Sequence, residues 1–376
     1  MKKICFITGT RADYGIMAPI MKEIKESGDS QLQIVATNMH LSERHGMTVK
    51  EIEDDGFHVD AKIVSLDEGD SAGHIVKSMA KVEDGLAEVF QKLKPDLVVI
   101  LGDRYEALAA ASAAVVFNLP VAHLHGGETT EGAIDDKFRH AITKLADYHF
   151  AATPQYAERI VSMGEAVGSV FHSGAPGAEG EELEEKLGEL FFNRTGIMPW
   201  ESYILLSMHP VTLAEDKGEK EVKATLEALD TFINQGYKIL VTMPNSDPGN
   251  SMVRNLLISW VEGRKGAAVA VESLGSRLFH FALENAQAIV GNSSAALIEA
   301  PTYRIPSVNV GIRQKGRAHG VSVIDVEPEK KSIVKALEEA LSLEMKVVMM
   351  AQPVSALNPY YKENSAKFIA KKLIEI

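Results

Sequence analysis

Short apolar runs rich in valine and isoleucine alternate with longer amphipathic stretches along most of the chain. In the first half, the runs that indicate strands are residues 3–8, 32–37, 96–101, 121–124 and 149–153. The stretches between them with apolar residues at helical spacing are 14–26, 72–93, 105–117 and 136–146. Strands that are apolar throughout are typical of parallel sheets whose two faces are covered by helices. The pattern therefore predicts an α/β fold.

The same alternation restarts after a segment of different composition, residues 174–200. This segment contains two prolines, several glycines and a run of glutamates, which indicates a linker. Beyond it, the predicted strands are 203–208, 237–242, 268–271, 288–290 and 307–310, and the predicted helices are 219–234, 252–262, 276–285 and 295–303. We therefore expect two Rossmann-like domains, over residues 1–178 and 199–363. Ligands of such sheets bind beyond the carboxyl ends of the strands, which predicts a site in an inter-domain cleft.

Composition and charge narrow the class of protein. The 376 residues are 45% hydrophobic and 24% charged, as in ordinary globular proteins. The 39 basic and 52 acidic residues give a net charge of −13, which disfavours partners such as nucleic acid or an anionic membrane. The single cysteine, Cys5, excludes an internal disulfide and a cysteine-based zinc site. Because the apolar run 4–7 is too short for a signal peptide, we expect a cytoplasmic, soluble protein.

Polar residues gather where the predicted strands end. The first strand leads through a glycine turn to Arg11, and such turns offer backbone N–H groups to phosphate, although the dinucleotide pattern G-x-G-x-x-G is absent. Asp103 and Arg104 follow the most apolar strand, where Asp103 is either a helix cap or a catalytic group. In the second half, His209 and Asn245 follow the first two strands, although turn chemistry alone also explains an asparagine there.

Two histidines and two carboxylates follow the fourth strand. His123 and His125 share a strand face, and Glu128 or Asp135 could complete a zinc site, but a histidine satisfied inside a buried strand is the more common case. Together with Asp103, Glu128 and Asp135 also give three carboxylates at neighbouring strand ends. Carboxylates that lie close together raise one another's pKa values, which suits acid and base catalysis. A solvated acidic loop is the alternative.

A glycine–asparagine–serine–serine turn is the strongest phosphate signal. Ser293 and Ser294 lie between a strand and a helix, where small residues, hydroxyls and backbone N–H groups favour a diphosphate. Glu299 falls on the first turns of that helix, where its carboxylate can accept hydrogen bonds from ribose hydroxyls. Arg313 belongs to a basic loop, residues 311–317, which supplies cations in an otherwise acidic chain.

Five motifs in fixed order carry a resemblance that covers nearly the whole chain. They are GTRADYG, LGDRYEA, HLHGGETTEGAIDDKFRHAITK, GNSSAALIEAP and GIRQKGR. Together they resemble the hydrolysing UDP-N-acetylglucosamine 2-epimerases of bacterial sialic-acid biosynthesis. The resemblance implies a glycosyltransferase-B architecture, in which a last helix at about 364–376 completes the first domain, and it implies no metal or redox cofactor. Non-hydrolysing epimerases carry H-x-E-A-G at residues 123–127, so either His125 or Glu128 would replace the missing glutamate.

The implied reaction converts UDP-N-acetylglucosamine and water into UDP and N-acetylmannosamine. The hydrogen on C2 becomes acidic only as the C1–O bond to UDP breaks, so the enzyme must stabilise a leaving diphosphate and hold a base at C2. Elimination gives 2-acetamidoglucal, and hydration with a proton delivered to the other face of C2 inverts that centre. We expect this chemistry to be carried by Asp103, Glu128, Asp135 and His209.

The other candidates are expected to bind the nucleotide-sugar as the domains close on it. They are Arg11, Arg104, His125, Arg139, Asn245, Ser293, Ser294, Glu299 and Arg313. A homodimer is the expected assembly, because dimers are the commonest oligomers of such proteins. Three alternatives stay open: the same reaction on a UDP-2,4-diacetamido-2,4,6-trideoxy-glucose, a glycosyltransferase of the same fold that needs an acceptor, and a nucleotide-sugar sensor without turnover.

Overall fold

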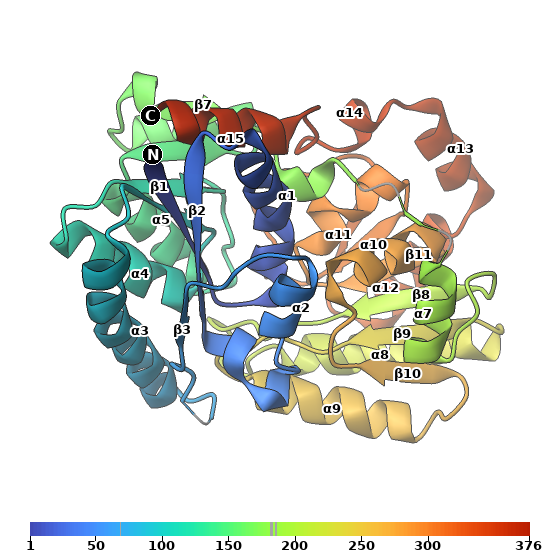
Figure 1. Cartoon of the computed structure of the whole chain (residues 1–376). Helices are drawn as coiled ribbons and strands as arrows, with labels where there is room; N and C mark the ends of the chain where they lie inside the picture. Colours follow the sequence, from blue (N-terminus) through green and yellow to red (C-terminus); the bar gives the residue numbers. More distant parts are fainter. Residues whose placement is uncertain (68, 181–182, 185) are drawn as a thin grey trace. The chain divides into compact units, whose positions relative to one another are not determined.

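The chain folds into two compact α/β units, each with its own parallel sheet (Figure 1). The computed structural model describes residues 1–67, 69–180, 183–184 and 186–376. Unit 1 comprises Met1–Glu128, Ile134–Glu179 and Lys362–Ile376, and unit 2 comprises Thr129–Ala133 and Gly180–Tyr361. A five-residue piece of the loop between a strand and a helix of unit 1 therefore belongs to unit 2. None of the helices in the described ranges is long and apolar enough to cross a membrane.

Unit 1 is built on a seven-stranded parallel sheet with the order β3-β2-β1-β4-β5-β6-β7. Its strands are β1 (Lys2–Thr8), β2 (Ser30–Thr37), β3 (Ala61–Ile63), β4 (Leu97–Leu101), β5 (Val121–Leu124), β6 (Tyr148–Ala151) and β7 (Val170–His172). Its α-helices are α1 (Arg11–Ser27), α2 (Val49–Asp54), α3 (Ala72–Leu93), α4 (Tyr105–Val116), α5 (Asp135–Leu145), α6 (Pro154–Ser162) and α15 (Ser365–Glu375).

Successive residues of β1 enter different cores, because side chains alternate across a strand. Ile4 and Phe6 pack with α1 and α15, whereas Cys5 and Ile7 pack with α3 and α4, which lie side by side in Figure 1. The N-terminus of α15 is capped inside unit 1, where the Glu179 carboxylate accepts hydrogen bonds from two backbone N–H groups at 3.0 and 3.1 Å. Both faces of the sheet are thus covered, as the continuous apolar runs predict.

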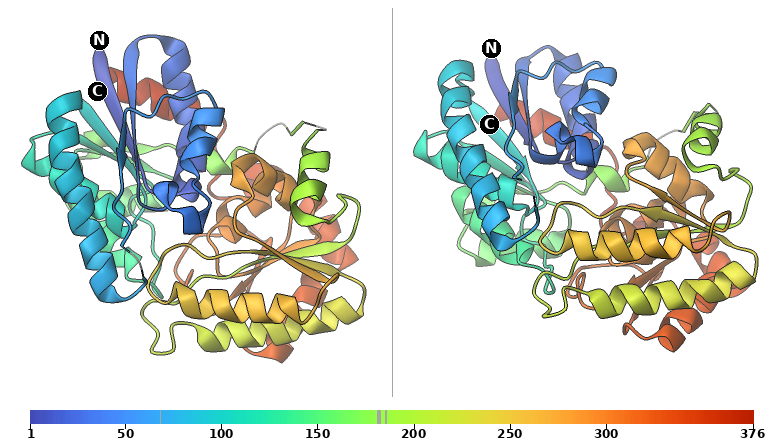
Figure 2. Two further views of the ribbon diagram at one scale, coloured as in Figure 1. Left: turned by 60° about the horizontal axis from the view of Figure 1, so that its bottom comes forward. Right: turned by 90° about the horizontal axis from the view of Figure 1, so that it is seen from below.

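Unit 2 repeats this design with a six-stranded parallel sheet of order β10-β9-β8-β11-β12-β13. Its strands are β8 (Tyr203–Ser207), β9 (Lys238–Thr242), β10 (Ala268–Val271), β11 (Ala288–Gly291), β12 (Ser307–Val310) and β13 (Val323–Val326). Its α-helices are α7 (Leu187–Thr195), α8 (Glu219–Asn234), α9 (Asn250–Glu262), α10 (Gly275–Asn285), α11 (Ala295–Ile298), α12 (Lys330–Ala340), α13 (Leu343–Ala351) and α14 (Val354–Leu357). Figure 2 shows α8 and α9 side by side along one face of this sheet, over its main core.

Two predicted segments differ from the structure. The expected linker at 174–200 includes the helix α7, and its residues 181, 182 and 185 lie outside the described residues. The helix expected over 295–303 is divided into α11 and a 3-10 turn, Ala300–Tyr303. Pro301 explains the break, because proline has no N–H group to continue the helical hydrogen bonds.

Candidate active site

Asp103 lies directly beyond β4 and is paired with a buried arginine. Its carboxylate accepts a hydrogen bond from the Arg139 guanidinium on α5. The Arg139 side chain is 1% exposed, whereas that of Asp103 keeps 21% of its surface accessible. A buried guanidinium requires a charged partner, and Asp103 supplies one. The structure therefore joins two residues that the sequence placed in different roles, catalysis for Asp103 and binding for Arg139.

His123 is a satisfied core histidine that ties two strand ends together. Its Nε2 lies 2.7 Å from the carbonyl oxygen of Gly102, and its Nδ1 lies 3.3 Å from the Thr143 hydroxyl. Burial is the main cause that lowers the pKa of His123 to about 3, so the ring is neutral at physiological pH. The Gly102 N–H also donates to the carbonyl of Leu124 at 2.9 Å. These bonds hold the turn that carries Asp103 against the end of β5.

His125 and Glu128 form a second pair beyond β5. The Nδ1 atom of His125 lies 2.7 Å from Oε1 of Glu128, and the two side chains are 7% and 0% exposed. The backbone of His125 has a φ of 61°, in the left-handed region that non-glycine residues rarely adopt. Its N–H group donates to the carbonyl of Phe150 at 3.0 Å. The structure thus brings together a residue predicted to bind substrate and one predicted to catalyse.

Two of the three predicted carboxylates therefore face cationic or imidazole groups. Asp135 is the first residue of α5 and is partly exposed. Asp103 and Glu128 each have a close partner of their own, Arg139 and His125 respectively. Among the residues that the structure describes, no group of three histidine, cysteine, aspartate or glutamate side chains is arranged to hold a metal ion.

Arg104 is paired with Glu106, a buried glutamate that was not among the predicted site residues. Its Nε donates to Oε1 of Glu106 at 2.6 Å, and Glu106 is 3% exposed. Burial raises the pKa of Glu106, while the Arg104 guanidinium opposes that change. A Cβ atom on Gly9 would lie 2.7 Å from Cγ of Glu106, so the glycine after β1 leaves room for this buried carboxylate. The signal in the sequence was weak, since Glu106 resembles an ordinary first-turn acidic residue.

The prediction of free N–H groups at the turn after β1 is wrong. The Asp13 carboxylate accepts hydrogen bonds from the N–H groups of Gly9 and Thr10, at 2.9 and 2.7 Å. Thr10 and Asp13 form a capping box at the start of α1, which satisfies the donors that would otherwise meet phosphate. Arg11 is the first residue of that helix and is partly exposed.

In unit 2, Gly291 and Asn292 belong to the turn that was predicted to bind phosphate. In the structure, both residues pack this turn against the end of β8. Gly291 has a φ of 137°, and a Cβ atom there would lie 2.0 Å from the carbonyl oxygen of Ser207. The Asn292 side chain accepts a hydrogen bond from the His209 N–H at 2.7 Å and donates to the His209 carbonyl at 2.9 Å. The space beside Gly291, which was expected to admit a diphosphate, is therefore occupied by the backbone at the end of β8. Asn292, which the sequence analysis did not assign, fixes the backbone of His209.

The basic loop after β12 is attached to the same turn. Arg313 and Gln314 donate side-chain hydrogen bonds to the Asn292 carbonyl at 3.0 and 2.8 Å. The Arg313 guanidinium also lies 4.0 Å from the carboxylate of Asp247, which is 4% exposed. Asp247 follows β9, as does Asn245, the residue predicted to bind substrate there, which is partly exposed. Asp247 was missed because its two-residue offset from Asn245 gives no pattern.

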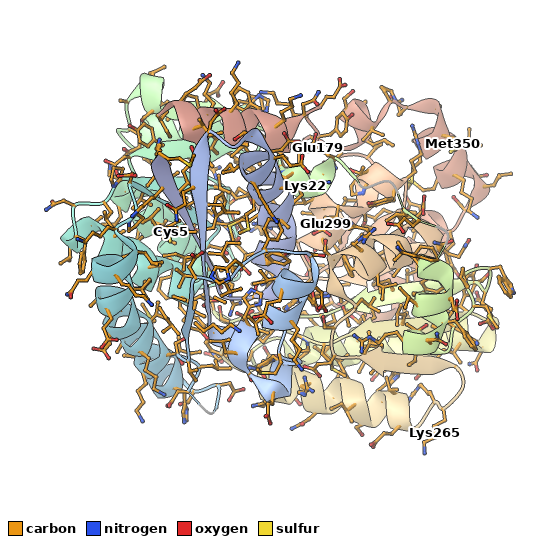
Figure 3. The ribbon with its side chains drawn as sticks, in the orientation of Figure 1. Cys5, Lys22, Glu179, Lys265, Glu299 and Met350 are labelled. Carbon is orange, nitrogen blue, oxygen red and sulfur yellow. The ribbon has the colours of Figure 1, made fainter. Side chains whose placement is uncertain are left out.

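Glu299 was expected on the first turns of a helix, but the structure places it after the end of α11. Helix α11 ends at Ile298, and Glu299 is the residue that follows it (labelled in Figure 3). Its Oε2 lies 3.2 Å from Nε2 of His280 on α10, a residue that no motif indicated. Ser294 precedes α11 and is partly exposed, while Ser293 is 8% exposed and its hydroxyl accepts a hydrogen bond from the Ala295 N–H at 3.4 Å.

The segment Thr129–Ala133 packs against the basic loop within unit 2. The Thr129 hydroxyl donates to the carbonyl of Gly316 at 2.7 Å. A Cβ atom on Gly132 would lie 2.7 Å from Cα of Arg313, which is closer than real side chains come. The segment that follows Glu128 in the sequence is thus in direct contact with the backbone that carries Arg313.

Known proteins share this organisation. The chain matches the UDP-N-acetylglucosamine 2-epimerase family over residues 22–374. Polysialic acid biosynthesis protein P7 of Escherichia coli is 34% identical, over 97% of this chain and 92% of that protein. A UDP-N,N'-diacetylbacillosamine 2-epimerase (hydrolyzing) of Legionella pneumophila is 38% identical, over 91% of this chain and 89% of that protein.

A solved structure extends the likeness to the fold. The UDP-GlcNAc 2-epimerase of Neisseria meningitidis bound to UDP-GlcNAc superimposes with a TM-score of 0.81 at 18% identity, over 100% of both chains. The predicted fold class, two Rossmann-like domains of the glycosyltransferase-B type, is confirmed.

Proposed function

This chain belongs to the UDP-N-acetylglucosamine 2-epimerase family, and on that premise we propose that it is a hydrolysing epimerase of sialic-acid biosynthesis. Its reaction converts UDP-N-acetylglucosamine and water into UDP and N-acetylmannosamine. The observation that carries the proposal is the 34–38% identity, over nine-tenths of the chain, to proteins named for polysialic acid biosynthesis and for hydrolysing 2-epimerisation.

The reaction proceeds in two steps. In the first, a base removes the proton from C2 while the electron pair of the C1–O bond leaves with UDP, which gives 2-acetamidoglucal. In the second, a proton is delivered to the opposite face of C2 and water adds to C1. Two proton-transfer groups are needed, and Asp103, Glu128, Asp135 and His209 are the candidates. The pairing of Asp103 with buried Arg139 supports a fixed position for one of these carboxylates.

The remaining candidate residues of the two units bind the nucleotide. In unit 2, Ser293, Ser294, Glu299 and Arg313 hold UDP, with Asn245 beside them. In unit 1, Arg11 and Arg104 contact the phosphates. Guanidinium groups suit a leaving diphosphate because charge-assisted hydrogen bonds strengthen as its negative charge develops. The anchoring of Arg313 on the Asn292 carbonyl supports this role, because it fixes the arginine beside the serine turn.

Incubation with UDP-N-acetylglucosamine in deuterated water, followed by NMR, tests the reaction. We expect UDP and N-acetylmannosamine with deuterium at C2, formed without any acceptor sugar. Release of UDP only when an acceptor is added would instead identify a glycosyltransferase. Binding of the UDP-sugar without turnover would identify a sensor.

A second substrate is favoured by one observation. The relative from Legionella pneumophila, named for UDP-N,N'-diacetylbacillosamine, is 38% identical to this chain. The same experiment with this UDP-2,4-diacetamido-2,4,6-trideoxy-glucose, run in parallel, compares the two values of kcat/KM directly. The larger value identifies the substrate, since the enzyme discriminates through transition-state binding.

A further inference from the structure

We propose that His125 and Glu128 act as a dyad in which Nε2 of His125 removes the proton from C2 and Glu128 positions the ring. This inference rests on the proposed epimerase function. It assigns proton transfer to His125, which the sequence alone favoured for binding, and it assigns Glu128 a positioning role.

The tautomer of His125 follows from its partner. An ionised carboxylate only accepts hydrogen bonds, so the 2.7 Å contact requires a proton on Nδ1 of His125. The lone pair of the neutral ring then lies on Nε2, which is the atom that a general base uses. Among the described residues, Nε2 of His125 is buried and has no hydrogen-bond partner. Glu128 is 0% exposed, so its carboxylate is closed off from solvent.

The loop that carries the dyad is closely packed. His125 is held in the left-handed region, with φ at 61°, by the hydrogen bond of its N–H group to Phe150. A Cβ atom on Gly127, whose φ is 76°, would lie 2.5 Å from the carbonyl oxygen of Tyr156. The Arg159 guanidinium donates to the carbonyl of Gly127 at 2.8 Å. Such a backbone keeps the ring in one orientation, as proton transfer requires.

The dyad lies beyond the end of β5, and Asp103 lies beyond the end of the neighbouring strand β4. In the register of β4 and β5, Leu101 pairs with Leu124. His125 therefore follows β5 at the same level at which Gly102 follows β4. His123, two residues earlier, bonds to Gly102 through Nε2 and has its pKa lowered to about 3 by burial, so it cannot take up a proton near neutral pH. Of the two histidines, His125 is the one whose Nε2 lacks a protein partner among the described residues.

The proton balance of the first step is complete with these groups. Nε2 of His125 accepts the C2 proton as the C1–O electron pair leaves with UDP, and the Glu128 carboxylate stabilises the imidazolium that forms. The ring then returns its proton to solvent. Hydration of the glucal uses a second proton donor on the other face of C2, a role left to Asp135 or His209.

Variants of both residues test the dyad in deuterated water. We choose His125→Asn because asparagine tolerates the left-handed backbone better than most residues, and Glu128→Gln because it has the same shape without the charge. For His125→Asn we expect kcat to fall about 10²- to 10⁴-fold, the usual contribution of a general base, with KM changed less than about threefold. Added imidazole should restore part of the rate of His125→Ala.

Glu128→Gln separates positioning from a merely structural role. Without the carboxylate charge, the imidazolium is less stable, so the acid side of the kcat–pH profile should move to lower pH while UDP binding stays at the wild-type level. His319→Asn removes another histidine–carboxylate contact, to Asp325 at 3.0 Å, and serves as the matched control with an unchanged profile.

The outcomes separate the dyad from the proposed function. Wild-type turnover together with near-normal kcat in His125→Asn, or an unshifted pH profile in Glu128→Gln, would overturn the dyad alone. Loss of UDP binding in His125→Asn that accounts for the whole loss of activity would also overturn it. Absence of deuterium at C2 with the wild-type protein and both UDP-sugars would overturn the epimerase function, and the dyad with it.

Discussion

The two units share one topology but place different chemistry at the carboxyl ends of their strands. In unit 1, these ends carry titratable pairs, Asp103 with Arg139 and His125 with Glu128. In unit 2, the amide side chain and carbonyl of Asn292, which do not titrate, hold the backbone of His209 and the side chain of Arg313. Unit 2 also has two titratable contacts, Glu299 with His280 and Arg313 with Asp247. We therefore expect the paired groups of unit 1 to serve proton transfer and the anchored Arg313 of unit 2 to serve binding.

The two units also share one structural feature at their strand ends. In each unit, a glycine after a strand packs against a buried glutamate: Gly9 against Glu106, and Gly311 against Glu221, with 2.7 and 2.8 Å between a hypothetical Cβ and the glutamate Cγ. Burial raises the pKa of both glutamates. This feature of the scaffold is therefore shared by the two units.

The largest effect is expected for Gly291→Ala. Its Cβ would lie 2.0 Å from the Ser207 carbonyl oxygen, and its φ of 137° strains any side chain. Urea denaturation should show a loss of about 3 kcal/mol or more, since several such penalties act together. Gly263→Ala is the control, because its nearest neighbour would be at 3.6 Å in an ordinary contact. Equal stability of the two variants would show that β8 and β11 adjust freely.

Asp103→Asn should lower kcat strongly while leaving nucleotide affinity intact. Removal of the charge weakens the pair with Arg139 and removes a candidate proton-transfer group. We expect a decrease in kcat of about 10²- to 10⁴-fold with little change in KM. Steady-state kinetics with quantified glucal shows which step is affected. A variant that raises KM but keeps kcat would place Asp103 among the binding residues, and the contrast between the units would weaken.

Glu299→Ala should weaken UDP binding. Its carboxylate stands beside His280 with 17% of its side chain exposed, where it can accept hydrogen bonds from ribose hydroxyls. Loss of charge-assisted contacts costs about 1.5–3 kcal/mol, which is roughly ten- to a hundredfold in Kd. Equilibrium titration measures the change, with exposed Glu262→Ala on α9 as control. Unchanged affinity in Glu299→Ala would remove this residue from the UDP site.

The smallest effect concerns the pH dependence of stability in unit 2. The hydrogen bond between His319 and Asp325 raises the pKa of His319 and lowers that of Asp325. A raised histidine pKa stabilises the fold at low pH and loses that contribution as pH rises through it, while the lowered aspartate pKa loses its contribution as pH falls. Chemical denaturation should therefore show His319→Asn destabilised most at about pH 5 and hardly at all above about pH 8. A constant difference across that range would mean that charge is not involved.

The sequence predicted the sheets because burial on both faces leaves a local mark. Continuous apolar runs such as Ile4–Ile7 of β1 have no other common use in a soluble protein. The edge strands β3, β7 and β13 escaped prediction, since three or four residues give too short a pattern. The end of α11 also escaped, although Pro301 was a usable signal.

The contacts of the candidate site were less predictable than the fold. Strand-end position alone made Asp103, Glu128 and His209 candidates, and their roles stay predictions. Their partners come from elsewhere in the sequence, as His280 does for Glu299, 19 residues away on another helix. Such pairings depend on tertiary packing, which no local spacing records. The same limit applies to the buried contact of His125 with Glu128, which appears only in the folded chain.

Titration of UDP into His125→Asn and Arg313→Ala, side by side with the wild-type protein, tests most directly whether His125 serves proton transfer and Arg313 serves binding. We expect His125→Asn to bind UDP with the wild-type Kd and Arg313→Ala to bind about ten- to a hundredfold more weakly. Equal weakening in both variants, or weakening in His125→Asn alone, would contradict this division.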